Sequence, residues 1–341
     1  MNGLIPMFAT IAGFGVTFLM GIWMVPFLKK LKFGQTIYDE GPRWHKSKQG
    51  TPTMGGLMII IGVICAIALS FTVASFTRGS SLIAQTKDPM KMTFFFSGIG
   101  MALGMGFIGF IDDYIKVVKK RNLGLTARQK TFFQLLVAVC YLSSLALGGM
   151  STTWLPWIGE IDIMSGPGLL FWPIAVIFVY GFTNAVNLSD GIDGLATTVT
   201  LVIFCFFMLA SGLMSFSAIN VLSAAAAGAC IGFLCWNAHP AKVFMGDTGS
   251  MFLGGLVVSL AFGINRPVLL FLAGIVYLIE ALSVVIQVSY YKRIKKRIFK
   301  MSPLHHHFEM SGWSEEKIVL VFSLITLVGC FVSILPIIFH M

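Results

Sequence analysis

Charged residues are scarce in this chain: they make up 11% of its 341 residues, whereas 57% of the residues are hydrophobic. Together with a mean hydropathy of +0.87, this scarcity excludes an ordinary water-soluble domain and is typical of an integral membrane protein. A membrane-spanning helix needs roughly 20 mostly apolar residues. We predict ten such helices, at 5–28, 54–73, 93–111, 132–149, 169–186, 196–213, 218–236, 250–264, 267–290 and 318–338.

The links between these segments are too short to hold a separate soluble domain. We therefore expect an all-α integral membrane protein in which residues 1–341 form a single polytopic membrane domain. We do not expect the first segment to be a cleavable signal peptide, because it lacks a basic start and is followed by Lys29 and Lys30 rather than by a small-residue cleavage site.

Cysteine is also rare, and none of the six cysteines stands at a spacing typical of metal ligands. All six fall within apolar segments, so we predict that they are small core residues. The chain contains no Walker motif, dinucleotide-binding fingerprint or EF-hand loop. The common nucleotide-binding and calcium-binding loops are therefore not indicated.

Basic residues outnumber acidic ones, 24 to 14, which gives a formal net charge of +10. With the N-terminus outside, 20 of the 24 basic residues lie on one side, in the links 29–53, 112–131, 237–250 and 291–317. The positive-inside rule places this side in the cytoplasm and both termini on the extracytoplasmic side. The excess of basic residues therefore mainly reflects the orientation of the chain in the membrane. We expect membrane lipid and an anionic substrate as partners, and no nucleic acid.

Most acidic residues gather in the same cytoplasmic links, and Glu280 is the one acid inside a predicted helix. It is either a functional group or a neutral side chain hydrogen-bonded to a neighbouring helix. An ion-coupled transporter carries ionisable groups near the bilayer midplane, whereas an enzyme acting on a lipid headgroup carries them at one interface. The pattern favours an enzyme with its active-site cleft on the cytoplasmic face. A secondary transporter of nucleotide- or lipid-linked sugars is the alternative from another class.

Asp112 and Asp113 stand at the expected C-terminal end of a helix, where the helix dipole is negative and cations are preferred. An ion pair between Asp112 and Lys116, one turn apart, would be the plain explanation. The more specific one is a divalent cation, since Mg²⁺ is typically held by one or two carboxylates together with substrate phosphates. Lys116 and the basic run 119–121 then favour a polyphosphate substrate.

Asn187, Asp190 and Asp193 are spaced three residues apart, so a helical or near-helical turn would place all three on one side. Gly191 and Gly194 loosen the backbone and allow a ligand to approach closely. We predict a substrate-binding turn here, and a plain polar turn between helices is the alternative.

Asp247 comes just before a predicted helix, where free backbone N–H groups and the positive end of the helix dipole suit an anion. The alternative is that Asp247 or Thr248 caps the helix. Phe244, three residues earlier, is a candidate to stack on a base.

Three consecutive histidines, His305 to His307, point in different directions, so we do not expect one zinc ion held by all three. Imidazoles at an interface suit phosphate contact or proton relay, and an incidental polar loop is the alternative. The preceding segment, 290–300, is basic and amphipathic and suits the anionic inner leaflet.

These four clusters, in this order on one face, resemble the polyprenyl-phosphate N-acetylhexosamine-1-phosphate transferases. Within that superfamily, PLHHHFE at 303–309 and HKSKQGTPTMGG at 45–56 are similar to motifs of the phospho-N-acetylmuramoyl-pentapeptide transferases of the MraY type. DDYIK at 112–116 and NAVNLSDGIDG at 184–194 strengthen the likeness, which covers essentially the whole chain.

The resemblance implies a multi-pass enzyme of the bacterial cytoplasmic (inner) membrane that acts in peptidoglycan synthesis. It would transfer phospho-MurNAc-pentapeptide from UDP-MurNAc-pentapeptide to undecaprenyl phosphate, giving lipid I and UMP, with Mg²⁺ as cofactor. The implied catalytic residues are Asp112, Asp113, Asp247 and His305, with the metal on Asp247 and Asp112. The implied substrate-binding residues are Lys48, Thr53, Lys116, Asn187, Asp190, Asp193, Asn237, Phe244, Gly246, Gln287 and His306.

Several alternatives stay open at this point. The donor could instead be UDP-GlcNAc, as in a GlcNAc-1-phosphate transferase, although the three histidines argue against it. Direct attack by undecaprenyl phosphate, helped by Asp112 or Asp113, is preferred to a covalent phospho-aspartate. A further basic residue of the family corresponds to Arg128 or Lys130, and the sequence does not decide whether the protein is a homodimer.

Overall fold

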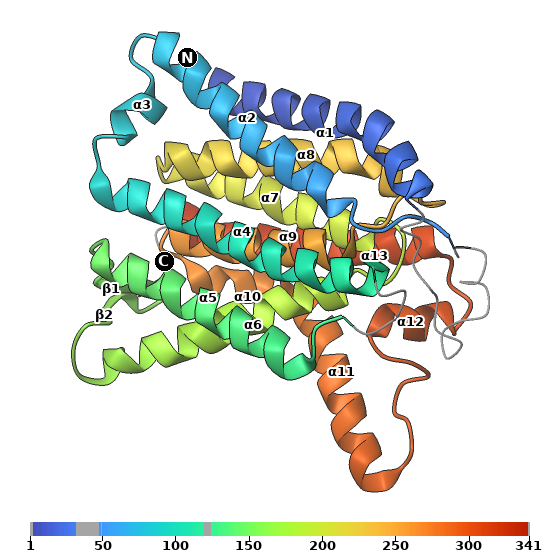
Figure 1. The fold of residues 1–341 in the computed structure, drawn as a ribbon. Helices are drawn as coiled ribbons and strands as arrows, with labels where there is room; N and C mark the ends of the chain where they lie inside the picture. The colour runs from blue at the N-terminus through green and yellow to red at the C-terminus, as the bar shows by residue number, and fades with distance from the viewer. Residues whose placement is uncertain (1–2, 32–47, 49, 119–123, 340–341) are drawn as a thin grey trace.

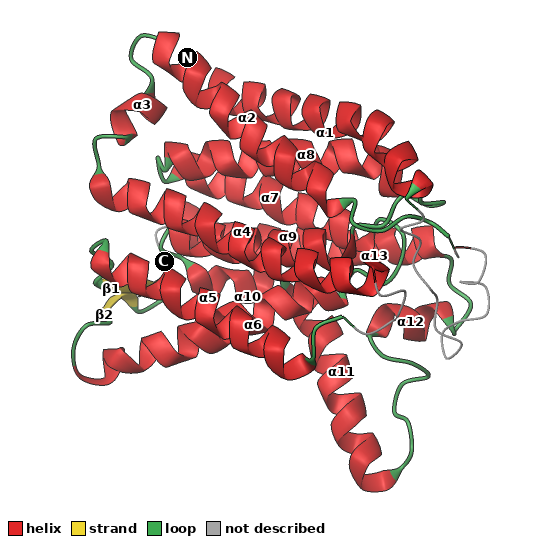
Figure 2. Cartoon of the chain, viewed as in Figure 1, coloured by secondary structure: helices red, strands yellow, loops and turns green. Residues whose placement is uncertain are grey.

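The computed structural model describes residues 3–31, 48, 50–118 and 124–339. Over these residues the chain forms a bundle of long helices that run side by side, with one small β-hairpin (Figures 1 and 2). The elements are, in chain order, α1 (Leu4–Lys30), α2 (Gly56–Phe76), α3 (Ser81–Gln85), α4 (Pro89–Val118), α5 (Ala127–Leu147), β1 (Thr152–Leu155), β2 (Gly159–Asp162), η2 (Gly166–Leu170), α6 (Phe171–Leu188), α7 (Leu195–Leu213), α8 (Ser217–Asn237), α9 (Gly246–Gly263), η3 (Pro267–Leu269), α10 (Leu270–Ala273), α11 (Ile275–Ile294), α12 (Leu304–Glu309) and α13 (Glu315–Ile338).

Within the described residues, nine helices are long and apolar enough to cross a membrane, which confirms the all-α membrane class. The predicted span at 250–264 corresponds to α9, which is not among the nine because its first turn carries Asp247, Thr248 and Ser250. From Thr248 to Gly263 every residue of α9 is buried. Because of this burial, α9 is a central helix enclosed by the others rather than a helix facing lipid (Figure 1). With 18 residues it is about 27 Å long.

The prediction of one continuous helix over 267–290 is wrong. The chain forms η3 and α10 first, and the new helix α11 begins after Gly274. Figure 1 shows that α11 leaves the bundle at its C-terminal end. Residues 291–298, in the segment predicted to be basic and amphipathic, are all exposed.

Close packing of α4 against α9 explains three of the glycines between residues 98 and 109. A Cβ on Gly98 would lie 2.9 Å from the Cβ of Ser259, and one on Gly106 would lie 3.0 Å from that of Phe252. A Cβ on Gly109 would overlap with the backbone of Asp247. These small residues therefore let the two helices approach closely.

Both chain ends lie at one end of the bundle. In Figure 1, α1 starts and α13 finishes on the left, while α12 and the C-terminal end of α4 lie on the right. The β-hairpin, which was not predicted from the sequence, lies between α5 and α6, with β1 and β2 paired antiparallel.

The cysteine prediction was only partly correct. Cys230 and Cys330 are buried, and Cys65 is partly buried. The exposed cysteines are Cys140, Cys205 and Cys235. They lie on helices of membrane-spanning length, where a surface that faces lipid accommodates a small apolar thiol as readily as a protein core does.

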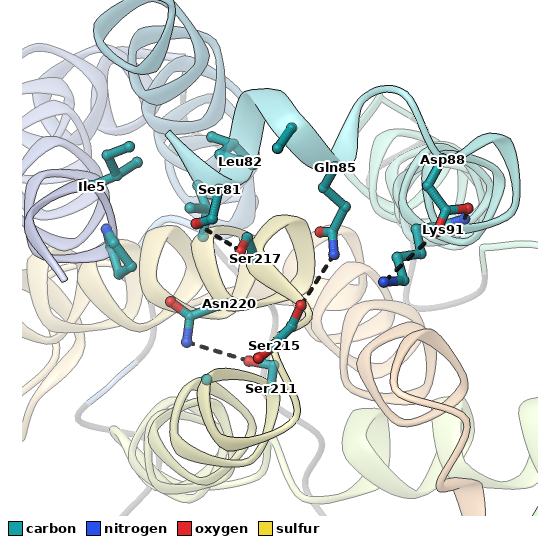
Figure 3. A pocket seen from close by; sticks show the side chains of 14 residues that line it. Ile5, Ser81, Leu82, Gln85, Asp88, Lys91, Ser211, Ser215, Ser217 and Asn220 are labelled. Atoms are coloured by element: carbon teal, nitrogen blue, oxygen red, sulfur yellow. Dashed lines mark hydrogen bonds and ion pairs between the residues drawn. The ribbon is translucent and has the colours of Figure 1, made fainter. Parts of the chain in front are cut away.

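A cavity of about 420 Å³ lies among α1, α3, the start of α4 and the α7–α8 turn (Figure 3). Several of its polar groups are bonded to one another: Gln85 donates to the carbonyl of Ser215 at 3.2 Å, and Ser217 donates to Ser81 at 2.9 Å. None of the residues predicted to act in catalysis or substrate binding lines it. This cavity is therefore separate from the candidate site.

Candidate active site

Three carboxylates meet where the C-terminal end of α4 lies against the N-terminal end of α9. Asp112 and Asp113 belong to α4, which runs to Val118, and each is only 3% exposed. Asp247 belongs to the first turn of α9. Oxygen atoms from all three lie within 4.8 Å of one another. The structure thus brings together the acids that the sequence analysis selected from two distant segments.

Asp113 caps α9 from a neighbouring helix. Its carboxylate accepts the backbone N–H of Asp247 at 3.2 Å and that of Thr248 at 2.9 Å, and it accepts the Thr248 hydroxyl at 2.7 Å. The expectation that these N–H groups are free for a substrate anion is therefore wrong, as is capping by Asp247 or Thr248 itself. The favourable position for negative charge at this helix end is taken by Asp113.

Replacing Thr248 by valine should destabilise the protein, because Thr248 is fully buried and its hydroxyl bonds a carboxylate. Loss of a hydrogen bond to a charged group costs about 1.5–3 kcal/mol of the free energy of unfolding. Thermal unfolding in detergent should show a lower Tm for Thr248→Val, whereas Thr248→Ser, which keeps the hydroxyl, should stay close to the wild type. Equal Tm values for the two variants would contradict the capping role.

Asp247 is the most connected member of the cluster. Its carboxylate lies 3.1 Å from the ammonium of Lys116 and 2.8 Å from that of Lys130, and it accepts the Asn187 amide at 2.9 Å. Lys116 also lies 2.6 Å from Asp112, one helical turn before it. The plain ion pair expected from the sequence is thus present, but it is part of a larger network.

The contacts also distinguish the two candidates for the further basic residue. Lys130, in the first turn of α5, reaches Asp247 directly. Arg128 has no ion pair of this kind within the described residues. Lys130 is therefore the basic residue that α5 contributes to the cluster.

The donor set fits a hard divalent cation. Carboxylate oxygens are the ligands that Mg²⁺ prefers, and three carboxylates here face only two ammonium groups. Asp113 accepts three hydrogen bonds from α9, and Asp247 has three polar partners of its own. Asp112, with one backbone N–H and one ammonium partner, has the most freedom to bind an ion.

A second polar cluster lies around Asp193, which is 4% exposed. Lys48 contacts Asp193 at 2.8 Å and Glu315 at 2.6 Å, and His239 lies 3.0 Å from the other oxygen of Asp193. The backbone N–H of Ala241 completes the set at 3.0 Å. This network explains how the buried carboxylate of Asp193 is tolerated. Its charged and polar partners offset the cost of removing the charge from water.

Asn187 and Asp193 do not share one side of a helical turn as predicted. The helix α6 ends at Leu188, and Gly194 adopts a φ of +75°, which leads into α7. Asn187 therefore joins the cluster of Asp247, whereas Asp193 joins that of Lys48. The 189–194 turn links the two clusters.

Asp190 lies within this turn, between the two clusters. Burial raises its pKa to about 8, and the negative charges of Asp247, Asp113 and Asp193 add to the shift. The surroundings of this turn therefore disfavour the charged form of Asp190.

Each of the three consecutive histidines has a different partner. The ring of His305 lies 3.1 Å from Glu280, that of His306 lies 2.6 Å from Glu309, and His307 accepts a backbone N–H from Lys300 at 3.1 Å. The three rings thus turn toward three different partners. The first of these contacts confirms that Glu280 is hydrogen-bonded to a neighbouring helix, α12.

Gly246, the first residue of α9, and Thr53, in the chain before α2, lie beside Asp113 of the cluster. Gly246 has a φ of +72°, and a Cβ on it would lie 2.6 Å from Asp113 and 2.7 Å from the hydroxyl oxygen of Thr53. Only glycine fits this position. Phe244 is half-buried, and its backbone bonds Pro52 and Gly55, which ties the two segments together.

Two predicted substrate-binding residues make their polar contacts inside the protein. Asn237 donates to the carbonyl of Val243 at 3.0 Å and accepts the Thr197 hydroxyl at 2.9 Å. The side chain of Gln287 bonds the backbone of residues 298–299. Asn237 therefore ties the α8–α9 link to α7, and Gln287 ties α11 to the chain that leads to α12.

Some predicted contributors lie outside the described residues. They are the basic run 119–121 and positions 45–47 and 49 of the first-loop motif.

Comparison with known proteins shows which class of enzyme this chain belongs to. A model described as glycosyl transferase family 4 matches residues 95–265, and a signature of phospho-N-acetylmuramoyl-pentapeptide-transferases matches residues 48–60. Fold, site and these matches define a polytopic membrane transferase of the phosphoglycosyl class.

Relatives described as phospho-N-acetylmuramoyl-pentapeptide-transferase identify the particular family. That of Acetivibrio thermocellus is 44% identical over 95% of this chain and 92% of its own. That of Halalkalibacterium halodurans is 43% identical over 92% and 91% of the two chains. That of Clostridioides difficile is 40% identical over 97% of both. The chain belongs to the phospho-N-acetylmuramoyl-pentapeptide-transferase family and is a multi-pass protein of the bacterial cytoplasmic membrane.

Proposed function

We propose that the protein transfers phospho-MurNAc-pentapeptide from UDP-MurNAc-pentapeptide to undecaprenyl phosphate, and so releases UMP and forms lipid I. The observation that carries the proposal is the cluster of Asp112, Asp113 and Asp247 with Lys116 and Lys130, at one end of the helices of a chain in this family. The reaction belongs to peptidoglycan synthesis and cell wall biogenesis.

The cofactor in this proposal is Mg²⁺, held by Asp247 and Asp112. When bound, such an ion neutralises charge on the diphosphate and on the leaving UMP. Lys116 and Lys130 add fixed positive charge at the same place, because each already lies within 3.1 Å of Asp247. Phosphoryl transfer depends mainly on this kind of positioning and charge stabilisation.

The two neighbouring acids receive different roles. Asp113 is occupied by three hydrogen bonds from α9 and holds the helix that carries Asp247 in place. Asp112 makes a backbone hydrogen bond and one ion pair, so it is the acid that orients the acceptor phosphate. The acceptor phosphate is mostly ionised at neutral pH, with a second pKa of about 6, so it needs little help from a base.

Direct attack by undecaprenyl phosphate makes a clear prediction. Labelled UMP should not exchange into the nucleotide-sugar donor when the lipid acceptor is absent, because the donor bond breaks only as the acceptor attacks. The measurement is the radioactivity of the re-isolated donor after incubation with enzyme, metal and labelled UMP. Exchange at a rate near kcat would replace direct attack with a covalent phospho-aspartate.

Lys48 and Asp193 form the nucleotide end of the site in this proposal. Replacing Asp193 by asparagine removes the charge that holds Lys48 and His239 together. We expect Asp193→Asn to raise the KM for the nucleotide-sugar donor about 10-fold or more, since charged hydrogen bonds contribute about 1.5–3 kcal/mol. Steady-state kinetics with the acceptor saturating measure this, and a wild-type KM would remove Asp193 from the donor site.

The same proposal fixes the orientation of the protein. We place the end with the acid cluster in the cytoplasm, where a UDP-linked donor is available, and both termini on the opposite side. The positive-inside bias of the sequence supports this orientation. We also propose that residues 1–341 act as one membrane domain.

Release of UMP by purified protein tests the function. UDP-MurNAc-pentapeptide and UDP-GlcNAc are each supplied with undecaprenyl phosphate, in the presence and absence of Mg²⁺. Metal-dependent release with the muramyl donor alone is the expected result. Release with UDP-GlcNAc alone would assign the protein to the GlcNAc-1-phosphate transferases. Flux of either sugar across liposomes without turnover would support a transporter instead.

A further inference from the structure

Glu280 and His305 form a buried acid–imidazole pair with no exposure to solvent. Both side chains are 0% exposed. Glu280 lies in α11 and His305 in the first turn of α12, 25 positions later in the chain. A buried carboxylate next to an imidazole is costly to maintain unless the groups satisfy each other.

The carboxylate holds His305 at two points. One oxygen of Glu280 accepts the backbone N–H of His305 at 3.1 Å, and the other lies 3.1 Å from Nδ1 of its ring. Because a carboxylate accepts hydrogen bonds, the proton of the neutral imidazole belongs on Nδ1. The ring is therefore fixed in direction, with an unprotonated Nε2 on its far side.

The far side of the ring faces the 189–194 turn. Nε2 of His305 is buried and has no hydrogen-bond partner within the described residues. A Cβ on Gly191 would overlap with Nε2, so the ring lies directly against the backbone of the turn. Asn187, just before the turn, donates a hydrogen bond to Asp247, and Asp193, near the end of the turn, forms an ion pair with Lys48. The middle of the turn, with Asp190, is the part that His305 supports.

We propose that Glu280 is a positioning residue that fixes the tautomer and direction of His305, and that His305 in turn sets the middle of the 189–194 turn beside the acid cluster. The inference rests on the proposed function, because it assigns the pair to the same reaction. His305 then acts through the turn rather than by touching substrate.

The kinetic test compares Glu280→Gln, His305→Asn and the double variant. An amide N–H₂ opposite Nδ1 would favour the other tautomer and loosen the ring. Loss of an orienting carboxylate costs about 10- to 100-fold at metal-bound histidines and about 10⁴-fold in a catalytic triad. We expect kcat to fall about 100-fold in each single variant, with the donor KM changing less than about threefold. The double variant should be no slower than the worse single variant.

Two further variants serve as controls. Ser283 is buried one turn after Glu280 on α11, and its hydroxyl bonds the carbonyl of Glu280. Ser283→Ala should therefore keep kcat within about twofold, since it disturbs the same helix turn without touching the pair. Glu280→Asp keeps the charge but is too short to make both contacts, so it should lose less activity than Glu280→Gln.

The tautomer supplies a readout that needs no substrate. In protein with ¹⁵N-labelled histidine, the resonances missing from His305→Asn identify His305 among the six histidines. The wild type should show an unprotonated Nε2, and Glu280→Gln should show a protonated one. An unchanged tautomer, additive kinetic losses, or a raised KM with normal kcat would each overturn the proposal. A wild type without any turnover would instead reject the proposed function, and the tautomer would still test the pair.

Discussion

Asp247→Asn should lower kcat at least about 10³-fold while the protein stays folded. Asp247 is the carboxylate that Lys116, Lys130 and Asn187 all contact. An amide of the same size removes its charge, and with it a proposed ligand of the cation and the partner of both ammonium groups. Losing one preorganised charge-stabilising group at a reaction centre costs about 10²–10³-fold, and loss of the metal adds to this. Initial rates of UMP release measure the effect.

Asp88→Asn is the matched control for this substitution. Asp88 is a partly exposed acid just before α4, at the end of that helix far from the cluster, and it is paired with Lys91 at 3.7 Å. Exposed ion pairs of this kind contribute little, so the control should keep kcat within about twofold. If Asp247→Asn also kept more than a tenth of the wild-type kcat, the acid cluster would not be the reaction centre.

Removal of the divalent cation should abolish turnover, and Mg²⁺ should restore it. The reason is the surplus of carboxylates over ammonium groups in the cluster, which a bound dication compensates. Binding to the folded protein also stabilises it, by about 1.4 kcal/mol at ten times the Kd. We therefore expect Mg²⁺ to raise the Tm of the wild type.

The same measurement on Asp247→Asn separates a bound ion from a general salt effect. The variant should lose the rise in Tm with Mg²⁺, while it and the wild type should respond equally to a monovalent salt of matched ionic strength. An equal rise with Mg²⁺ in both proteins would place the ion elsewhere. Full activity in the presence of a strong chelator would exclude the metal from the reaction.

The sequence predicted the positions of the helices because hydropathy reports the lipid environment directly. It also selected Asp112, Asp113 and Asp247, since acids at the ends of apolar segments conflict with both the lipid and the helix dipole. These signals are local. The break at Gly274 was missed because residues 267–290 are apolar on both sides of it.

Contacts between distant segments were not predictable from one sequence. The capping of α9 by Asp113 joins positions 134 apart or more, and the ion pair of Lys48 with Glu315 joins positions 267 apart. Glu315 and His239 were not selected at all, because an acid at a helix start and a histidine before a proline are ordinary features. Only packing of the helices shows that they surround Asp193.

The fate of the donor's β-phosphate tests the central claim most directly. Purified protein with Mg²⁺ and undecaprenyl phosphate would receive UDP-MurNAc-pentapeptide labelled at the β-phosphorus. Transfer of a phospho-sugar predicts that the label enters the lipid and that the released nucleotide is unlabelled UMP. Labelled UDP in the aqueous phase, together with a sugar joined to the lipid through a single phosphate, would contradict the account and define a simple glycosyl transfer.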